Sequence, residues 1–270
     1  MSTAKAFAAT RAEGRAALVG YLPAGFPSVE GSIEALTVMV DAGCDLIEVG
    51  LPYSDPVMDG PTIQAAAQQA LEGGVHTADV LRTVEAVAAT GTPTVVMTYW
   101  NPIERYGVDR FAADLANAGG AGLITPDLTP DSGPEWVAAA DARDLDKIFL
   151  IAPSSTDERL AMTTAACRGF VYATAVMGVT GARASTSELA GPLVERARAA
   201  IRDQGTDLPI GVGLGVSNGD QAAEVASYAD AVIVGSAFVR TLLDARGDRT
   251  AGLSALRLLT EDLAAGVRRG

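Results

Sequence analysis

The chain has 270 residues, of which 49% are apolar and 20% are charged, and its formal net charge at pH 7 is -13. An apolar fraction of this size suits a globular protein with a large core and excludes a disordered chain. The acidic balance excludes nucleic acid and anionic membrane surfaces as partners, because both require a basic face. An anionic substrate must therefore be held locally, by backbone donors rather than by net charge.

Cysteine content and the N-terminal segment indicate the compartment. Cys44 and Cys167 are too few for a disulfide scaffold and lack the spacing of metal ligands, so we expect free thiols in a reducing compartment. The N-terminal residues hold only a short apolar patch, too small for the core of a signal peptide, and no apolar run reaches membrane-spanning length. These features predict a cytoplasmic protein.

Apolar runs typical of strands alternate along the chain with Ala-, Leu- and Val-rich segments of helical spacing. A short helix over residues 3–12, which carries Phe7, comes first and is expected to close one end of the fold. The expected strands are residues 17–22, 45–50, 94–99, 122–125, 147–151, 169–174, 208–212 and 231–235. The expected helices are residues 29–41, 63–72, 78–89, 110–118, 134–142, 157–166, 187–203, 220–228 and 253–265.

Eight strands that alternate with helices predict a (β/α)8 barrel, an α/β fold of the TIM-barrel type. The chain shows no linker and no shift in composition, so we expect a single domain over residues 1–270, with the short N-terminal helix as an addition. A doubly wound open sheet is the competing fold, since it is built from the same alternation of elements.

In a barrel, active sites lie at the C-terminal ends of the strands, so the segments that follow the strands should meet at one rim. These segments are residues 23–27, 48–60, 99–101, 125–127, 152–155, 175–181, 213–215 and 235–236. The last two are rich in glycine and precede helices, an arrangement that binds phosphate through backbone N–H groups. Residues 178–181 add another amide-rich turn, although glycines at such turns often serve tight geometry alone.

The second expected strand carries an acid, Glu48, among apolar residues. Side chains alternate along a strand, so Ile47 and Val49 share one face while Glu48 lies on the other. A buried ionised carboxylate is costly unless it is paired or protonated, so such a position is rarely kept for packing alone. Asp55 and Asp59 follow in a loop, where the alternative interpretation is that they form turns before a proline and a glycine.

Few side chains in this sequence suit nucleophilic or metal chemistry. Of the two lysines, Lys5 lies near the terminus and Lys147 opens the fifth strand, at the end of the barrel opposite the rim, so neither suits a Schiff base. The single histidine, His76, lies in a turn between helices and is interpreted as a surface or capping residue. A His-based triad and a His-based metal site are therefore poorly supported.

Carboxylates and phenols remain as candidate functional groups. They are Glu48, Asp59, Asp127, Tyr99 and Tyr172. An enzyme with this equipment would move protons on a phosphorylated substrate that supplies its own electron sink.

The run from Ile47 to Gln64, which holds Glu48 and Asp59, closely resembles the signature of the tryptophan synthase alpha chain family. Further matches lie at residues 97–102, 126–128, 152–155, 178–181, 211–213 and 235–236, in family order across nearly the whole chain. The resemblance implies a (β/α)8 lyase that cleaves indole-3-glycerol phosphate to indole and glyceraldehyde 3-phosphate by retro-aldol chemistry. It implies no cofactor in this subunit.

The resemblance also implies roles for single residues. Glu48 matches the family's general acid and base, which protonates C3 of the indole ring, and Asp59 matches the acid that binds the indole N–H. Tyr172 aligns with a tyrosine near the catalytic acid and Tyr99 with one that lines the indole pocket, while Asp127 is assigned to substrate binding. The residues that match the phosphate site are Gly181, Gly213, Gly235 and Ser236.

A partner is implied as well: family members dock on a beta chain that carries pyridoxal phosphate, in an alpha2-beta2 heterotetramer, and pass indole to it through a tunnel. Residues 53–61 and 178–190 resemble the family's mobile loops. Two departures affect these features: Val176 replaces a common arginine, and two extra residues follow Leu214. A stand-alone lyase and a non-catalytic phosphate-binding activator subunit are the alternatives.

Overall fold

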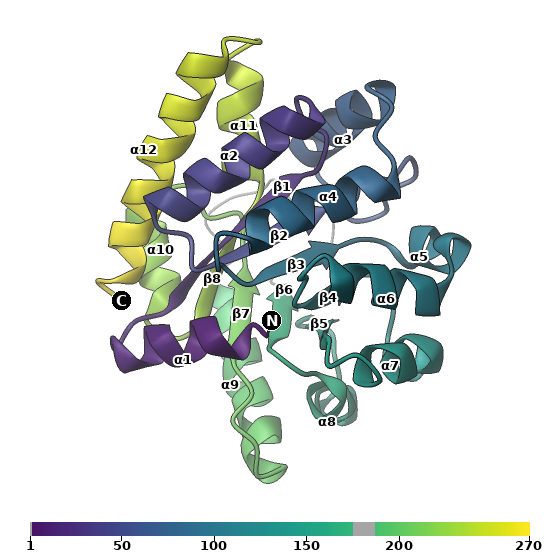
Figure 1. The fold of residues 1–270 in the computed structure, drawn as a ribbon. Coiled ribbons are helices and arrows are strands. Elements are labelled where there is room, and N and C mark those ends of the chain that lie inside the picture. The colour runs from purple at the N-terminus through teal and green to yellow at the C-terminus, as the bar shows by residue number, and fades with distance from the viewer. Residues whose placement is uncertain (1, 175–186) are drawn as a thin grey trace.

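The computed structural model describes residues 2–174 and 187–270 and contains a closed barrel of eight parallel strands (Figure 1). Each strand pairs with its neighbours in chain order, and the last pairs with the first. The strands are β1 (Ala17–Pro23), β2 (Leu46–Gly50), β3 (Thr94–Met97), β4 (Gly122–Thr125), β5 (Asp146–Ile151), β6 (Val171–Thr174), β7 (Ile210–Gly213) and β8 (Ala231–Val234). The predicted (β/α)8 barrel is confirmed, and closure excludes the open sheet.

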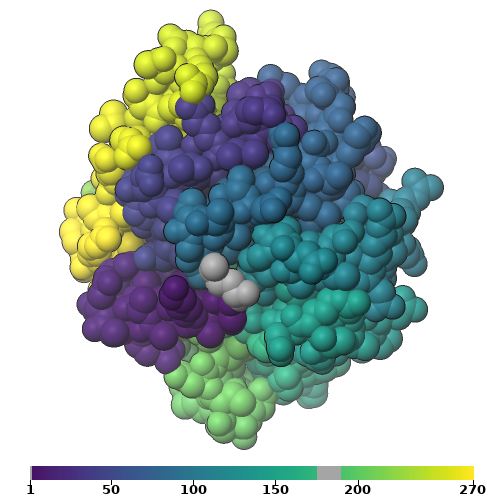
Figure 2. Space-filling view, in the orientation of Figure 1, coloured from purple at the N-terminus to yellow at the C-terminus, as the bar shows by residue number. Residues whose placement is uncertain are grey.

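Helices surround the barrel. They are α1 (Ala4–Ala12), α2 (Val29–Ala42), α3 (Pro61–Glu72), α4 (Thr77–Ala88), α5 (Trp100–Tyr106), α6 (Val108–Asn117), α7 (Pro134–Asp141), α8 (Asp157–Ala166), α9 (Ser187–Asp203), α10 (Gly219–Ala226), α11 (Ser236–Asp244) and α12 (Arg249–Val267). The C-terminal helix α12 packs against α2 and α10, so the end of the chain completes the ring beside its beginning. In the space-filling view, α1, α2, α4 and α6 cover one side of the barrel (Figure 2).

Each predicted strand is present, with ends that differ by two residues at most, but α5 and α11 lie outside the predicted helices. Residues 99–101 have the composition of a turn, and Pro102 follows them. In the structure Pro102 occupies the first turn of α5, where a missing N–H breaks no helical hydrogen bond. Helix α11 starts at Ser236, and a single residue, Gly235, separates it from the end of β8.

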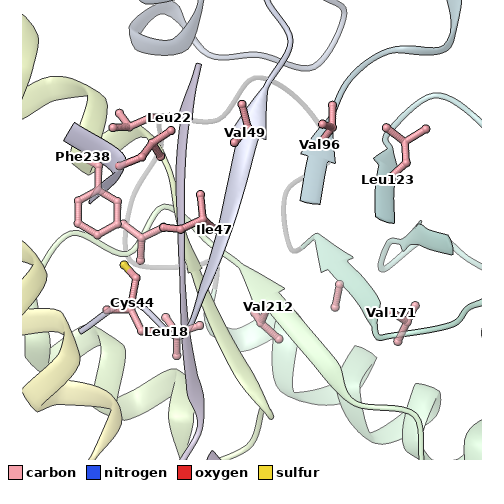
Figure 3. Close-up of a cluster of buried hydrophobic side chains, with 14 of the residues drawn as sticks. Leu18, Leu22, Cys44, Ile47, Val49, Val96, Leu123, Val171, Val212 and Phe238 are labelled. Carbon is pink, nitrogen blue, oxygen red and sulfur yellow. The ribbon is translucent and has the colours of Figure 1, made fainter. Parts of the chain in front are cut away.

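The strands divide the core into an inner and an outer part because their side chains alternate. The inner cluster fills the barrel and consists of Phe7, Ala17, Val19, Leu46, Val95, Ala121, Ile124, Ile148, Phe170, Ala231 and Ile233. The outer cluster lies between strands and helices and includes Leu18, Leu22, Ile47 and Val49 (Figure 3). Glu48 lies on the face opposite to Ile47 and Val49 in β2, as the sequence predicted, and because these two residues belong to the outer cluster, this face is the barrel interior.

Helix α1 closes the bottom of the barrel, where the strands begin. Its Phe7 packs against Phe170 with ring centroids 5.5 Å apart. The chain just before α1 is fixed by Asp146 at the start of β5, which is fully buried and accepts hydrogen bonds from the Thr3 N–H at 2.8 Å and the Thr3 hydroxyl at 2.7 Å. Lys147, the next residue, pairs with Asp141 at this same end. The barrel is therefore sealed at the end opposite the rim.

In the described part of the chain, no helix is long and apolar enough to cross a membrane.

Candidate active site

A cavity of about 120 Å³ opens at the rim of the barrel, where the strands end. We call it the rim pocket; it is lined by Tyr21, Glu48, Met58, Asp59, Ile63, Met97, Tyr99, Pro126, Leu150, Tyr172, Thr174, Gly213, Gly215, Ile233, Gly235 and Ser236. Seven of the nine site residues that the sequence predicted line this pocket, and they come from segments spread over nearly 190 positions of the chain. The closed barrel is what brings them together.

Glu48 forms the base of the rim pocket. It is the third residue of β2, it is only 1% exposed, and its Oε1 atom has no hydrogen-bond partner among the described residues. Burial raises the pKa of this carboxyl group from 4.5 to about 8, because the charged form loses hydration that nothing replaces. Glu48 therefore carries its proton at neutral pH and can donate it to a bound molecule.

Asp59 lies at the mouth of the pocket, at the end of the loop that joins β2 to α3, and it is half-buried. Its backbone carbonyl accepts a hydrogen bond of 2.7 Å from the Gln64 side chain, which fixes the loop to the first turn of α3. Burial raises the pKa of Asp59, and a hydrogen bond with Tyr99 opposes part of that rise. The two acids thus differ in environment: one is enclosed, and the other is partly hydrated.

Tyr99 anchors the same loop from the segment between β3 and α5. Its hydroxyl accepts a hydrogen bond of 3.0 Å from the Met58 N–H, and its ring packs against that of Tyr53 with centroids 5.4 Å apart. Tyr99 is buried and precedes the first residue of α5. This tyrosine consequently does two things: it lines the pocket and holds the loop that carries Asp59.

Tyr172 enters the pocket from β6, on another side of the barrel from β2. Its hydroxyl lies over Gly213 of β7, where a Cβ atom would stand 2.3 Å from it, so only glycine leaves room for this phenol. Burial first, and then the charge of Glu48, raise the pKa of Tyr172 well above its usual value. The phenol therefore stays protonated beside the buried acid.

The wall of the pocket at the ends of β7 and β8 offers backbone N–H donors. Gly235 is the residue before the first turn of α11, and Ser236 begins that helix. The first N–H groups of a helix have no intrahelical partner and carry a partial positive charge, which favours an anion. Gly213 and Gly215 lie on the same wall, and Gly215, with φ of 75°, is one of the two residues that follow Leu214. This wall can hold a phosphate group.

One of the predicted site residues lies elsewhere, and another is not among the described residues. The carboxylate of Asp127 is exposed and accepts hydrogen bonds of 2.9 and 3.1 Å from the Trp100 N–H, so it caps the start of α5 and does not line the pocket. Gly181, like Val176, lies outside the described residues. Substrate binding by Asp127 and phosphate binding by Gly181 stay predictions.

The interpretation of His76 as a capping residue is confirmed. His76 is the N-cap of α4, and its backbone N–H donates a hydrogen bond of 3.0 Å to the Asp79 carboxylate in the first helical turn. Among the described residues, no group of three or more His, Cys, Asp and Glu side chains is placed to hold a metal ion.

Sequence reasoning missed Tyr21 and the apolar residues of the pocket. Tyr21 is two residues after Val19, an inner-core residue, so strand alternation was a usable signal for its inward direction. Met97, Leu150 and Ile233 make an apolar lining that suits a flat aromatic group, but nothing distinguishes them from core residues in the sequence. Their role follows from the open space beside them.

A larger cavity of about 590 Å³ lies outside the barrel, between α2, α3, α11 and α12. Its charged side chains, including Glu34 and Arg249, are all at least partly exposed, and these two form an ion pair. It lacks the buried carboxyl group and the row of strand ends that the rim pocket has, so the chemistry belongs to the rim pocket.

Comparison with known proteins agrees with this geometry. The sequence model of the family described as tryptophan synthase alpha chain matches residues 7–268. The chain is 65% identical to the tryptophan synthase alpha chain of Salinispora tropica over 263 residues, which cover 97% of this chain and 96% of that one.

Solved structures agree as well. A Mycobacterium tuberculosis tryptophan synthase chain superposes with a TM-score of 0.90 at 56% identity, covering 99% of this chain and 98% of that chain. The tryptophan synthase subunit alpha of Legionella pneumophila gives a TM-score of 0.86 at 31% identity, with 99% and 98% covered. Matching over nearly the full length, in sequence and in structure, shows that the chain belongs to the tryptophan synthase alpha chain family.

Proposed function

We propose that the rim pocket is where this lyase of tryptophan biosynthesis cleaves indole-3-glycerol phosphate to indole and glyceraldehyde 3-phosphate, with Glu48 and Asp59 as its catalytic acids. Family membership gives the reaction, and one observation supports its location. A buried carboxyl group with a pKa of about 8 lies at the base of a pocket whose wall carries the N-terminus of a helix. A proton source and an anion site in one cavity suit an aromatic substrate with a phosphate tail.

The reaction begins with proton transfer from Glu48. Because this carboxyl group is protonated at neutral pH, it donates its proton to C3 of the indole ring, and a positive charge arises on the ring. The resulting carboxylate then accepts the proton of the glycerol hydroxyl next to the C3–carbon bond. That bond breaks, its electron pair returns to the ring, and the former alcohol carbon becomes the aldehyde. Glu48 is again protonated.

Asp59 stabilises the positive charge that appears in this sequence. Its carboxylate would accept a hydrogen bond from the indole N–H, so that the negative charge lies beside the nitrogen on which the positive charge forms. The hydrogen bonds from Gln64 to the Asp59 carbonyl and from the Met58 N–H to Tyr99 support this role, because they hold the acid at the pocket mouth. Pre-arranged charge of this kind is worth more in a dry site than in water.

Phosphate binding is proposed for the wall formed by Gly213, Gly235 and Ser236, with Gly181 added from the resemblance to the family. The N-terminus of α11 supports this proposal, since its free N–H groups can hold an anion in a chain of net charge -13. The indole ring would then extend across Met97, Leu150 and Ile233 toward the two acids.

An alpha chain of tryptophan synthase works with a beta chain, and we propose an alpha2-beta2 heterotetramer in the cytoplasm, with pyridoxal phosphate in the beta chain only. We include the loop of Asp59 in this contact, because it resembles a mobile loop of the family and its Val57 side chain is 75% exposed. A stand-alone lyase differs from this arrangement only in releasing indole at full rate without a partner.

The decisive experiment measures indole released from indole-3-glycerol phosphate by the purified protein, with and without a tryptophan synthase beta chain. The substitution Glu48→Gln should lower turnover by about 100- to 10,000-fold while substrate still binds, because a general acid is lost and the shape of the side chain is kept. Glu104→Gln, the same change at an exposed position, is the control and should leave turnover unchanged.

The outcomes separate the candidate functions. Slow release by the protein alone that rises strongly with the beta chain supports the partnered enzyme, and fast release regardless of the partner indicates the stand-alone lyase. Near-normal turnover by Glu48→Gln would contradict the assigned role of Glu48, and no release under either condition would contradict the proposed reaction.

A further inference from the structure

Of the three phenols that line the rim pocket in the described residues, Tyr21 alone has no role predicted from the sequence. It lies in β1, and in the parallel pairing of β1 with β2 its Cα atom is the register partner of Glu48. Leu22 and Ile47 of the same two strands point to the outer core (Figure 3), so alternation turns Tyr21 and Glu48 to the interior. The two side chains are therefore neighbours on one face of the sheet.

The phenol of Tyr21 runs along the rim toward the end of β2. A Cβ atom placed on Gly50, two residues after Glu48 on the same face, would stand 2.3 Å from the Tyr21 hydroxyl. A Cβ atom on Gly235 would meet the other end of the ring, at 3.3 Å from Cδ1. The ring thus fills the space between the ends of β8 and β2, and its hydroxyl occupies the place where a side chain of residue 50 would be.

The two groups complement each other in hydrogen bonding. Within the part of the chain that the structure describes, Oε1 of Glu48 is buried and has no partner, although a carboxylate can accept several hydrogen bonds. The Tyr21 hydroxyl is held in its protonated, donating form, because burial first and then the charges of Asp59 and Glu48 raise the pKa of Tyr21 well above its usual value. The site therefore places a permanent donor beside an acid that becomes charged only during the reaction.

We propose that Tyr21 is a positioning residue, whose hydroxyl donates a hydrogen bond to the Glu48 carboxylate in the interval after Glu48 has protonated the substrate. This inference rests on the proposed function, since it needs Glu48 to become ionised during turnover. A hydrogen bond to the charged form stabilises that form and also holds the carboxylate toward the glycerol hydroxyl whose proton it must take. The Tyr172 phenol, which lies over Gly213, approaches from another side of the pocket.

The test is Tyr21→Phe, which keeps the ring that fills the rim and removes only the hydroxyl. We expect kcat for indole release to fall about 10- to 100-fold, the usual range for losing one hydrogen bond to a charged group, with KM changed less than about threefold. The alkaline limb of the activity profile should move to higher pH, because the Glu48 carboxylate loses a stabilising donor and holds its proton more tightly. A purely structural role of Tyr21 would not move this limb.

Two further variants complete the test. Tyr106→Phe removes a phenol hydroxyl that binds Asp114 away from the pocket, and it should keep both kcat and the profile. Gly50→Ala keeps the Tyr21 residue, but the new Cβ atom would stand 2.3 Å from its hydroxyl oxygen and 2.7 Å from Cζ, so the phenol must shift and the variant should reproduce the shift of the alkaline limb by a second route.

The results distinguish this inference from the proposed function. If the unmodified protein releases no indole, the proposed function itself is wrong. If the unmodified protein is active while Tyr21→Phe and Gly50→Ala both keep its alkaline limb, only the role of Tyr21 is overturned.

Discussion

Glu48 is stable in this fold only because it takes up a proton. Its neighbours in the pocket are mainly apolar or phenolic, and no cation lines the pocket within the described residues. The folded protein therefore retains a proton on Glu48 at pH values where the unfolded chain releases it. Proton uptake by Glu48 therefore couples the stability of the fold to pH, independently of catalysis.

The free energy of unfolding should depend on pH through this group. The pKa of Glu48 rises from 4.5 to about 8 on folding, so its contribution to stability is fully present below pH 4.5 and is lost as the pH rises to about 8. The side chain of Glu48→Gln cannot titrate, so its free energy of unfolding does not fall with pH through this group. Between pH 5 and pH 8 the free energy of unfolding of the variant, relative to that of the unmodified protein, should therefore increase by about 3 kcal/mol.

Urea denaturation of both proteins at the two pH values measures this change. Glu104→Gln, at an exposed site, should differ from the unmodified protein by less than about 0.5 kcal/mol at either pH. An equal effect of Glu48→Gln at both pH values would mean that Glu48 does not titrate between them.

At the scale of single elements, the loop between β2 and α3 depends on the side chain of Tyr99, which lies between β3 and α5. The Tyr99 hydroxyl accepts a hydrogen bond from the Met58 N–H, and the Gln64 side chain donates one to the Asp59 backbone carbonyl. The loop is therefore held at Met58 and at Asp59 itself. Placement of Asp59 is therefore a property of three elements together.

Tyr99→Phe should loosen this loop without altering the titration of Glu48. We expect kcat/KM to fall about tenfold, since a misplaced catalytic group loses much of its effect, while the alkaline limb of the profile stays where it is. Steady-state kinetics over a range of pH measures both quantities. A tenfold loss accompanied by a shifted limb would instead place Tyr99 in direct contact with the titrating acid.

The N-terminal segment depends in a similar way on Asp146, at the bottom of the barrel. Removing the Thr3 hydroxyl with Thr3→Val leaves a buried carboxylate short of one donor, which should lower the free energy of unfolding by about 1–3 kcal/mol. Ser2→Ala, at a partly exposed donor to the same carboxylate, should have a smaller effect in the same urea denaturation experiment. Equal losses would show that burial of the donor does not matter here.

For the whole molecule, stability depends on closing the ring of helices as well as the barrel. Helix α12 packs against α2 and α10, and it buries Leu256 completely while Leu258 on its other side is 67% exposed. The last helix is therefore part of the core rather than an appendage.

Substitutions on the two faces of α12 should reveal this. Leu256→Ala should lower the free energy of unfolding by about 2–5 kcal/mol through the cavity that it leaves, and Leu258→Ala should change it by less than about 0.5 kcal/mol. Thermal or urea denaturation of both variants measures the difference. Equal, small effects would mean that α12 unfolds apart from the barrel.

Much of this protein was determined by the sequence itself. The alternation of apolar runs and helical segments predicted the barrel, and the period of two within residues 45–50 placed Glu48 on the face opposite to Ile47 and Val49, because both depend on local spacing. The long signature from Ile47 to Gln64 predicted the family that the comparisons confirmed. Helix α5 was missed because Pro102 is a turn signal in sequence and a first-turn residue in the structure.

Only the tertiary structure decided which rim residues meet. The register of β1 against β2 brings Tyr21 beside Glu48, and the Trp100 N–H holds Asp127 as a cap of α5, although Asp127 follows a strand just as the acids of the pocket do. The raised pKa of Glu48 likewise comes from burial by residues distant in sequence. Spacing along the chain determines where a side chain points from its own strand, but its neighbours and its charge depend on the other strands that close around it.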